Sequence, residues 1–532
     1  MPTMMQKDIT YQIPLIHVVD VHDAILLEQE NAEWYRILRD FPWERYQGFA
    51  ALYYDHLYRF NVNEAEKREL QGEDEPNRET RAEAVQRLLF DRASMRALAG
   101  TKPPIIYQGK LVEADKTVDP KSLRPGIVPV RFAGRRPKCF FALFKSFIGA
   151  ALLGFAPEPE MVYLLLTSNL DFARACGFIP KGAKGKRRSR HTPSLRKIEQ
   201  FDQIMTESGL WNQIKLAEVG RNLRDGLFKK ETELVADTTH YYAYSAFETV
   251  TYVDEQGRDV KKSQAKVTKR CRCKDQDACP HDWVLADEGA GTIVKGNNRM
   301  HWGQKASIIG LPKQGIPLDA AAVTDGAIHD SQTLFPHVEK LFSELPELKE
   351  WTERVLYDSA CDGRDLKEQF RNDLGLELKA SLNPRRRKAV TVNLPRGIRE
   401  LTPHGDPICA AGFIMDYKGM RYDTEKFIYQ APAIKDGVTP CPTCSLKPVC
   451  CPNASNGRTL TVPFEILPHI DPTDPPMAKR FKAIMSRRPV VERMIKRLKC
   501  DLSDDRLSKR GTASFQAYLD KTMIAFHHLL RR

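Results

Sequence analysis

The sequence has no hydrophobic run long enough to cross a membrane. Its most apolar window, Cys139 to Phe155, is interrupted by Lys145 and followed by Pro157 and Pro159, so it predicts a buried core helix. The first residues lack the apolar stretch of a secretory signal, and neither a lipidation signal nor an amphipathic anchor is present. We therefore expect a bacterial cytoplasmic protein with no membrane partner.

A reducing cytoplasm excludes a disulfide framework for the twelve cysteines, some of which have the spacing of metal ligands instead. The pair Cys441-Pro-Thr-Cys444 predicts half of a structural Zn²⁺ site, which Cys450 or Cys451 and one further ligand would complete. An upstream cluster offers four ligands at tighter spacing: Cys271, Cys273, Cys279 and His281. Free buried thiols are the alternative for both clusters.

Length and charge restrict the architecture and the partner. A chain of 532 residues exceeds what a single core supports, so we expect two or three domains. The formal net charge of +13 and the isoelectric point near 9.1 favour a polyanionic partner. Because nothing in the sequence points to a membrane, that partner is expected to be nucleic acid.

Three acidic residues stand where chemistry is expected. Two of them, Asp237 and Asp358, follow short apolar runs that predict buried strands, and strand ends are where α/β folds place their active sites. The third, Glu492, lies in a predicted helix that opens at Pro489, one turn after Arg488 on the same helix face. A solvated helix with ordinary ion pairs is the alternative for this last segment.

These motifs together resemble the DDE transposases of bacterial insertion sequences, in the group that carries a Tyr-x2-Arg-x3-Glu-x6-Lys signature. Arg488, Glu492 and Lys499 fit three of its four positions, and Met485 occupies the tyrosine position. Asp237 and Asp358 match the first and second acids of the family. The resemblance extends from about residue 130 to the C-terminus, with several separate motifs in the family order.

The resemblance implies a metal-dependent enzyme that cuts and joins DNA. Asp237, Asp358 and Glu492 would be catalytic and would hold two Mg²⁺ (or Mn²⁺) ions, which suit in-line attack on a phosphodiester. Arg488 and Lys499 would hold nearby phosphates. The implied partner is double-stranded DNA, both the terminal inverted repeats of the element and its target, bound by a homodimer associated with the nucleoid.

The expected fold class is α/β, with a ribonuclease H-like catalytic core, an insertion domain and a preceding all-helical DNA-binding and dimerisation region. The core is predicted from its element order: antiparallel strands, a helix from Ser331 to Phe342, and a parallel strand from Val355 to Asp358. In that fold the first and fourth strands are adjacent, so Asp237 and Asp358 would be neighbours. The acid-rich segment that contains Asp330 competes for a catalytic role, but we expect Asp330 to cap the helix instead.

The sequence is divided by composition and by the resemblance. The expected parts are an N-terminal region of unknown role at 1–125, the helical domain at 126–225, the catalytic domain at 226–500 with a cysteine-containing insertion at 254–290 and an insertion domain at 383–474, and a helical tail at 501–532. A Gly-rich basic loop in the helical domain predicts contacts to DNA phosphates through Lys184, Lys186, Arg187, Arg188 and Arg190. A solvated linker is the alternative for this loop.

Two other functions remain open from the sequence. One is a ribonuclease H-like DNA nuclease without strand transfer, which would use the same acids. The other is a catalytically inactive, zinc-containing DNA-binding regulator, in which those acids would have no catalytic role. The three hypotheses differ in whether DNA is bound, cut or joined.

Overall fold

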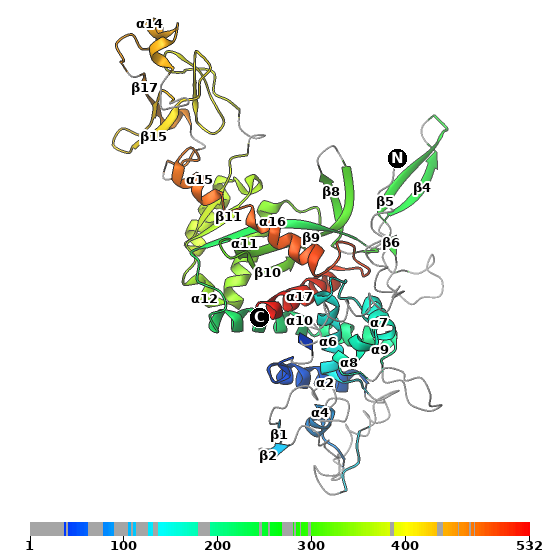
Figure 1. Ribbon diagram of the computed structural model, residues 1–532. Coiled ribbons are helices and arrows are strands. Elements are labelled where there is room, and N and C mark those ends of the chain that lie inside the picture. Colours follow the sequence, from blue (N-terminus) through cyan, green and yellow to red (C-terminus); the bar gives the residue numbers. More distant parts are fainter. Residues whose placement is uncertain are drawn as a thin grey trace, which may run out of the picture.

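The computed structural model describes most of the chain after residue 125 and shorter stretches before it (Figure 1). The described residues are 37–38, 41–61, 78–89, 105–107, 110–112, 126–130, 137–178, 192–243, 247–253, 256–265, 267–268, 280, 284–287, 289–295, 299–383, 388–432, 440–455, 457–467, 470–472 and 474–531. None of the helices found in these stretches combines the length and the apolar character that crossing a membrane requires.

A helical region precedes the sheet. Its elements are η1 (Trp43–Tyr46), α2 (Gln47–Asn61), α4 (Arg81–Leu89), α6 (Phe140–Leu152), α7 (Pro159–Ser168), α8 (Leu170–Ala175), α9 (Leu195–Glu207) and α10 (Leu210–Arg224), with a small hairpin of β1 (Ile105–Tyr107) and β2 (Lys110–Val112). Helix α6 is the apolar window of the sequence, and it is buried along nearly its whole length. The predicted core helix is therefore confirmed.

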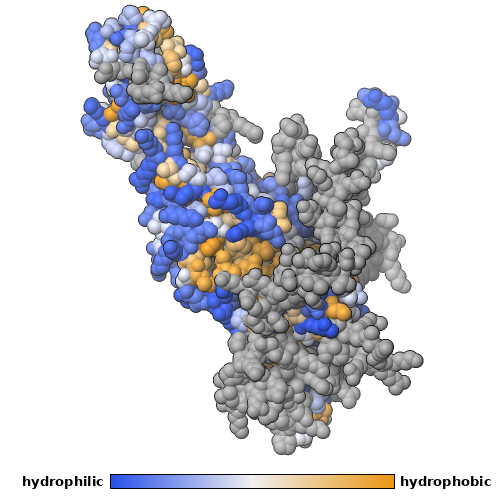
Figure 2. Space-filling view, in the orientation of Figure 1, coloured by the Kyte–Doolittle hydropathy of each residue, from blue (hydrophilic) through white to orange (hydrophobic). Residues whose placement is uncertain are grey.

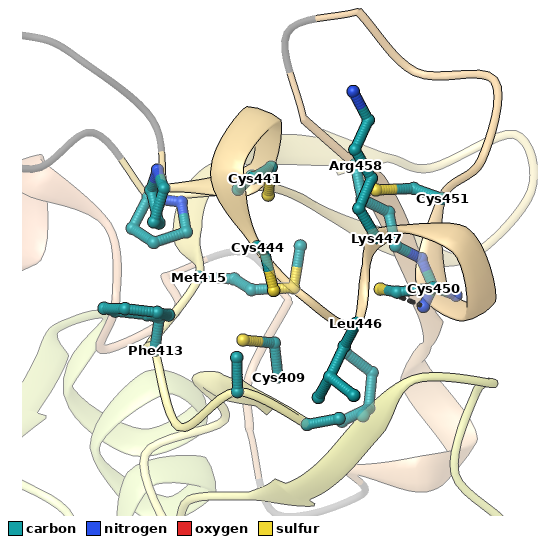
Figure 3. Close-up of a pocket in the computed structure, with 16 residues that line it drawn as sticks. Cys409, Phe413, Met415, Cys441, Cys444, Leu446, Lys447, Cys450, Cys451 and Arg458 are labelled. Atoms are coloured by element: carbon teal, nitrogen blue, oxygen red, sulfur yellow. Dashed lines mark hydrogen bonds between the residues drawn. The ribbon is translucent and has the colours of Figure 1, made fainter.

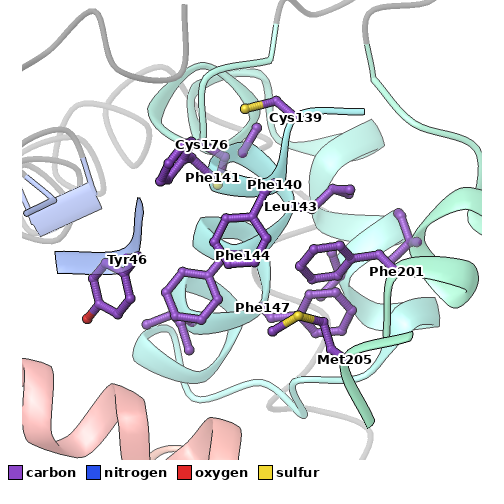
Figure 4. Packing of buried hydrophobic residues seen from close by; sticks show 14 of the residues in the cluster. Tyr46, Cys139, Phe140, Phe141, Leu143, Phe144, Phe147, Cys176, Phe201 and Met205 are labelled. Atoms are coloured by element: carbon purple, nitrogen blue, oxygen red, sulfur yellow. The ribbon is translucent and has the colours of Figure 1, made fainter. Parts of the chain in front are cut away.

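Aromatic side chains fill the centre of this region (Figure 4). The ring of Phe144 stacks on that of Phe140 at 5.6 Å between centroids and on Trp211 of α10 at 5.6 Å. Phe201 of α9 packs edge-on against the same tryptophan at 6.0 Å. Tyr46 also lies in this cluster, so the described part of the N-terminal region shares one hydrophobic core with the helices that follow it.

The centre of the molecule is a mixed α/β unit built on a mixed sheet. Its strands are β3 (Glu233–Tyr242), β8 (Gly291–Lys295), β9 (Arg299–Leu311), β10 (Ile316–Ala322), β11 (Arg354–Tyr357) and β12 (Glu377–Ala380). The order is β10-β9-β3-β11-β12, and β8 pairs with β9. Strands β10, β9 and β3 are antiparallel, whereas β3, β11 and β12 run parallel. The predicted adjacency of the first and fourth strands of the core is thus confirmed.

One expectation about the first strand is wrong. Asp237 does not end a strand, because β3 continues to Tyr242, and the next strand, β4 (Phe247–Val253), begins only after that. The reason is the long strand β9, which pairs with β3 from Val235 to Tyr242 and keeps it extended. On its other side β3 pairs with the parallel strand β11, which ends at Tyr357. Asp237 therefore lies where β3 is still paired with β9 but no longer with β11.

Helix α11 (Asp330–Glu344) connects the antiparallel strands to β11 and confirms the predicted crossover helix. Its N-cap is not Asp330, as the sequence suggested, but His329, whose Nδ1 accepts a hydrogen bond from the Ser331 N–H at 3.2 Å. Asp330 lies inside the first turn and pairs with Lys305 of β9 at 3.0 Å. That pair removes the carboxylate from the cap position. Further short elements of this unit are α12 (Pro346–Lys349), η4 (Ser359–Cys361), α13 (Arg364–Gln369) and η5 (Phe370–Leu374).

Two insertions extend from the sheet unit (Figure 1). The first carries the hairpin of β4 and β5 (Asp259–Ala265) and the short pair β6 (Val267–Thr268) and β7 (Val284–Leu285). The second has its own hydrophobic core and contains β13 (Ile398–Leu401), β14 (Pro407–Cys409), β15 (Asp416–Arg421), β16 (Lys426–Gln430), η7 (Cys441–Thr443), α14 (Lys447–Cys450), β17 (Thr459–Pro463) and η8 (Phe464–Ile466). This second insertion is rich in β-strands.

The chain returns to the sheet through α15 (Lys479–Met485), α16 (Val490–Lys496) and η9 (Arg497–Asp501), and it ends in α17 (Thr512–Leu529). Helix α17 belongs to two cores at once. Ile524 contributes to the aromatic core of the helical region, while Tyr518 and Met523 contribute to the core under the sheet. The last helix therefore joins the helical region to the sheet unit.

A buried charge cluster marks this junction. The ammonium group of Lys215 in α10 binds Asp319 of β10 and Asp520 of α17, the latter at 3.1 Å. His337 of α11 approaches the second oxygen of Asp319 at 3.1 Å. Burial opposes ionisation of Asp319, but the charge of Lys215 outweighs it and holds the pKa of that carboxyl well below its usual range. The ammonium group of Lys215 therefore links α10, β10 and α17 through ion pairs.

Replacing that cation tests its contribution. We expect Lys215→Met to destabilise the protein by about 3–5 kcal/mol, because the variant leaves two carboxylates buried without their partner. The measurement is the midpoint of urea unfolding followed by circular dichroism. Lys340→Met is the matched control, since that lysine is half-exposed and its ion pair with Glu344 is on the surface. Equal midpoints for the two variants would contradict the expectation.

Candidate active site

Asp237 is held in a fixed orientation by its own strand. Its Oδ1 atom accepts a hydrogen bond from the Thr238 N–H at 2.9 Å. The neighbouring residues of β3 on its N-terminal side, Leu234 to Ala236, are fully buried in the sheet. The second carboxylate oxygen, Oδ2, remains available for a cation.

Asp358 is fixed in the same manner at the end of the adjacent strand. Its Oδ1 atom accepts a hydrogen bond from the Ala360 N–H at 2.8 Å and so begins η4. The register of β3 with β11 pairs Val235 with Leu356, which brings the two aspartates to neighbouring positions on parallel strands. In each of them one oxygen is bound by the backbone and the other is left for the site.

Glu492 reaches the same place because α16 lies on the sheet. Val491 and Met494 of this helix form a small cluster with Val235 of β3 and Leu356 of β11. The approach is close at Gly310 of β9, where a Cβ atom would lie 2.5 Å from the Met494 sulfur. A glycine at this position therefore allows the helix to lie directly against the strand.

The guanidinium of Arg488 lies among the three acids. Its Nη2 is 2.7 Å from Asp237 Oδ2 and 4.0 Å from Asp358 Oδ2, and its Nη1 is 2.7 Å from Glu492 Oε1. The exposed fraction of the side chain rises from 15% for Asp237 through 39% for Asp358 to 61% for Glu492. The predicted convergence of the three carboxylates is therefore observed, around a cation supplied by the protein itself.

The environment of Asp237 changes the pKa of its carboxyl group. Burial raises its pKa to about 6, the negative charge of Asp358 contributes in the same direction, and Arg488 opposes both. The carboxyl therefore exchanges its proton close to neutral pH. Such a pKa is typical of groups at functional sites, although ion-pair networks also produce it.

The donor chemistry of the cluster suits a hard divalent cation. All three side chains offer carboxylate oxygens, the ligands that Mg²⁺ and Mn²⁺ prefer, and Arg488 shows that positive charge is favoured between them. Across the described stretches of the chain, no three His, Cys, Asp or Glu side chains are gathered closely enough to hold one ion as they stand. A metal at the acids would thus take the place of the guanidinium.

Two other cations near the acids, of which only Lys499 was predicted to contact DNA, bind parts of β3 instead. Arg487, next to Arg488, binds Glu233 of β3, which also pairs with Arg354 at 3.1 Å. Lys499 of η9 donates a hydrogen bond to the His240 carbonyl of β3, and its ammonium lies 5.2 Å from the centre of the Tyr241 ring. Both side chains fasten the C-terminal helices to β3. The phosphate contact of Lys499 stays a prediction.

A fourth acid lies near the cluster. The negative charge of Asp330 is one of the causes that raise the pKa of Asp237. Because Asp330 is paired with Lys305, its charge is partly neutralised by the protein. The sequence had offered this acid as a competitor for a catalytic role, and only its position in the first turn of α11 shows that it lies close to the site.

The outer surface of α16 is hydrophilic (Figure 2). Arg493, Lys496 and Arg497 are exposed on this helix and on the start of η9, beside the exposed carboxylate of Glu492. Positive charge therefore surrounds the open side of the acid cluster. Such a surface attracts anions.

The second group of candidate ligands surrounds a pocket in the insertion domain (Figure 3). Cys441, Cys444, Cys450 and Cys451 line it, as the sequence grouping suggested. Cys409, at the end of β14, lines the same pocket and was missed, because a single cysteine far upstream has no ligand spacing. The zinc site stays a prediction at this point.

The remaining predicted residues lie outside the described part of the chain. They are the cations of the basic loop, Lys184, Lys186, Arg187, Arg188 and Arg190, and the upstream cluster Cys271, Cys273, Cys279 and His281. Their roles stay predictions. The same holds for the domain boundaries.

The close approach at Gly310 gives a test of how α16 is positioned. We expect Gly310→Ala to lower the midpoint of urea unfolding by the equivalent of about 1–3 kcal/mol, because the new Cβ would also lie 2.5 Å from the backbone oxygen of Ile316, which cannot move aside. Gly48→Ala in α2 is the control, since nothing lies within 4 Å of a Cβ there. If both variants unfold at the wild-type midpoint, Gly310 is not as closely surrounded as described.

The chain has little detectable similarity to known proteins. No protein-family model matches the chain, and no curated protein matches it in sequence. Among solved structures, the chain is similar to the piggyBac transposase in a cryo-EM structure of its synaptic complex with hairpin DNA, with 7% identity, coverage of 84% of this chain and 74% of that one, and a TM-score of 0.30. Because that score is too low to support an argument, any functional conclusion depends on the site itself.

Proposed function

We propose that the chain is a DNA transposase of the DDE type, which cleaves DNA at the ends of a mobile element and transfers the cut strand into target DNA. The observation that carries the proposal is the convergence of Asp237, Asp358 and Glu492 on one guanidinium. The acids come from three distant segments of the sequence. Carboxylates are repelled by one another, so a fold that gathers three of them needs a cation between them.

The arrangement of the sheet supports the same proposal. An antiparallel trio joined through its first strand to two parallel strands is the order required of a ribonuclease H-like core. In such a core the first and fourth strands supply adjacent acids, as β3 and β11 do here. We infer the ribonuclease H-like class from this order and from the position of the acids upon it.

Asp237, Asp358 and Glu492 would hold the catalytic ions. Two bound Mg²⁺ or Mn²⁺ ions would supply activation of the attacking oxygen and stabilisation of the leaving oxygen during in-line displacement. Arg488, released from the acids, would be free to pair with a phosphate, for which its planar guanidinium is suited. The backbone bonds to Asp237 and Asp358 keep the remaining oxygens oriented throughout.

The proposed partner is double-stranded DNA, bound by a homodimer as the family resemblance implies. The net charge of +13 and the exposed cations of α16 favour this partner. The basic loop would add salt-dependent contacts that position the DNA without reading its bases.

A supercoiled plasmid that carries the terminal inverted repeats flanking the gene, incubated with Mg²⁺, tests the function. Cleavage at the repeats followed by joining to a target supports the transposase. Cleavage without joining would indicate a nuclease, and binding without cleavage would indicate a regulator. Both of these outcomes contradict the proposal.

Removal of single acids tests the site. We expect Asp237→Asn, Asp358→Asn and Glu492→Gln each to lower the cleavage rate by about a thousandfold or more, on the order of 4 kcal/mol of transition-state stabilisation, because each removes a metal ligand. DNA binding should remain. Glu368→Gln is the control, since that exposed carboxylate on α13 pairs only with a neighbouring arginine among the contacts described. A variant that cleaves at the wild-type rate would remove its residue from the site.

The raised pKa of Asp237 predicts a pH dependence of metal binding. A proton and a metal compete for this carboxyl, so its affinity for Mn²⁺ should fall as the pH decreases through about 6. Below that point we expect a loss of about tenfold per pH unit for a single competing proton, and little change well above it. Titration calorimetry with the full chain at several pH values measures this. A constant affinity over the range would contradict the assigned pKa.

A further inference from the structure

The cysteine-bearing segment of the insertion domain, residues 440–455, has a defined backbone but no core of its own. Every residue in it is at least partly exposed, and none belongs to the hydrophobic cluster formed by the surrounding strands. Its turns are held by local hydrogen bonds, such as Cys444 N–H to the Cys441 carbonyl at 3.3 Å and Cys450 N–H to the Leu446 carbonyl at 2.9 Å. Local bonds of this kind do not fix a short segment against a domain. A cross-link would supply what the missing core does not.

The pocket beneath this segment gathers the candidates for that cross-link (Figure 3). Cys441, Cys444 and Cys450 line it from the segment, and Cys409 lines it from the end of β14, part of a different sheet pair. Cys409 also begins a tight turn, in which its carbonyl accepts a hydrogen bond from the Gly412 N–H at 2.8 Å. Among the described residues that line the pocket there is no Asp, Glu or His. Its potential ligands are therefore all sulfur.

We propose that Cys409, Cys441, Cys444 and Cys450 bind one structural Zn²⁺ ion that fastens the 440–455 segment to β14. Thiolate sulfur selects zinc over the hard cations that suit the acid cluster. In the described part of the chain the four thiols line one pocket without meeting at one point, so binding would require their side chains to rotate toward the ion. Since the site lies in the insertion domain, this inference does not depend on the proposed catalysis.

The surroundings match the charge of such a site. Four thiolates around Zn²⁺ carry a net charge of −2, and two cationic residues, Lys447 and Arg458, line the same pocket. Arg458 donates a hydrogen bond to the Cys450 sulfur at 3.6 Å and so places a positive charge beside this ligand. Cations placed at the ligands offset the buried negative charge of the cluster.

The local packing selects Cys450 over Cys451 as the fourth ligand. Gly397 has a positive φ of 76°, and a Cβ atom there would lie 2.9 Å from the Cys450 sulfur. Glycine therefore leaves the space that this sulfur occupies beside Arg458.

Elemental analysis of the full chain, purified under reducing conditions, tests the proposal. We expect Cys409→Ser, Cys441→Ser, Cys444→Ser and Cys450→Ser each to lose about one zinc per chain relative to the wild type. Cys451→Ser and the exposed Cys500→Ser should keep the wild-type content. The zinc content of each variant is compared with that of the wild type, because any zinc bound by the upstream cluster from Cys271 to His281 would be present in all of these proteins.

A second measurement guards against variants that fold poorly. Chymotrypsin should cut the wild type after the exposed Leu446 at least about tenfold faster once the zinc is removed by a chelator, since the segment then loses its attachment. Full zinc content in Cys409→Ser would overturn the proposed ligand set, as would loss of zinc in Cys451→Ser. Cysteines found paired as disulfides in a zinc-free wild type would overturn the metal site altogether.

Discussion

The structure depends on a buried ammonium group at the junction of its parts. Lys215 holds Asp319 and Asp520 where the helical region, the sheet and the last helix meet. A buried charge is strongly destabilising without its partners. The ion pairs of Lys215 therefore favour the arrangement in which α10, β10 and α17 are packed together. Helix α17 reinforces this, since its side chains belong to both hydrophobic cores. The sheet that carries the acids is thereby held against the helical region.

The acid cluster follows the same physical logic nearer the surface. Three carboxylates on β3, after β11 and on α16 would repel one another, and the Arg488 guanidinium balances them. The site is built to contain positive charge, and its donors are oxygen. The candidate ligands among the described residues of the cysteine pocket in the insertion domain are sulfur atoms, with cations beside them. The two sites therefore suit different metals, and neither would draw ions from the other.

Much of the fold could be predicted from the sequence because its periodicity is strong. The core helix at Phe140, the crossover helix at Ser331 and the strand before Asp358 all appear where the pattern places them. The errors came from tertiary partners. Strand β9 extends β3 past Asp237, and the pair between Lys305 and Asp330 leaves the cap of α11 to His329. Strand β9 and Lys305 lie far along the sequence from Asp237 or Asp330, so the residues next to these acids do not indicate the pairing.

The sequence by itself determined which side chains are candidates: three acids, a signature arginine and a cysteine pair with ligand spacing. Tertiary structure decided how they are combined. It showed that Arg488 contacts all three acids, and that Cys409 joins the cysteine pocket from a distant hairpin. The physical reason is that spacing along a chain reports only neighbours within a few turns, whereas strand register and helix packing bring together residues separated by a hundred positions or more.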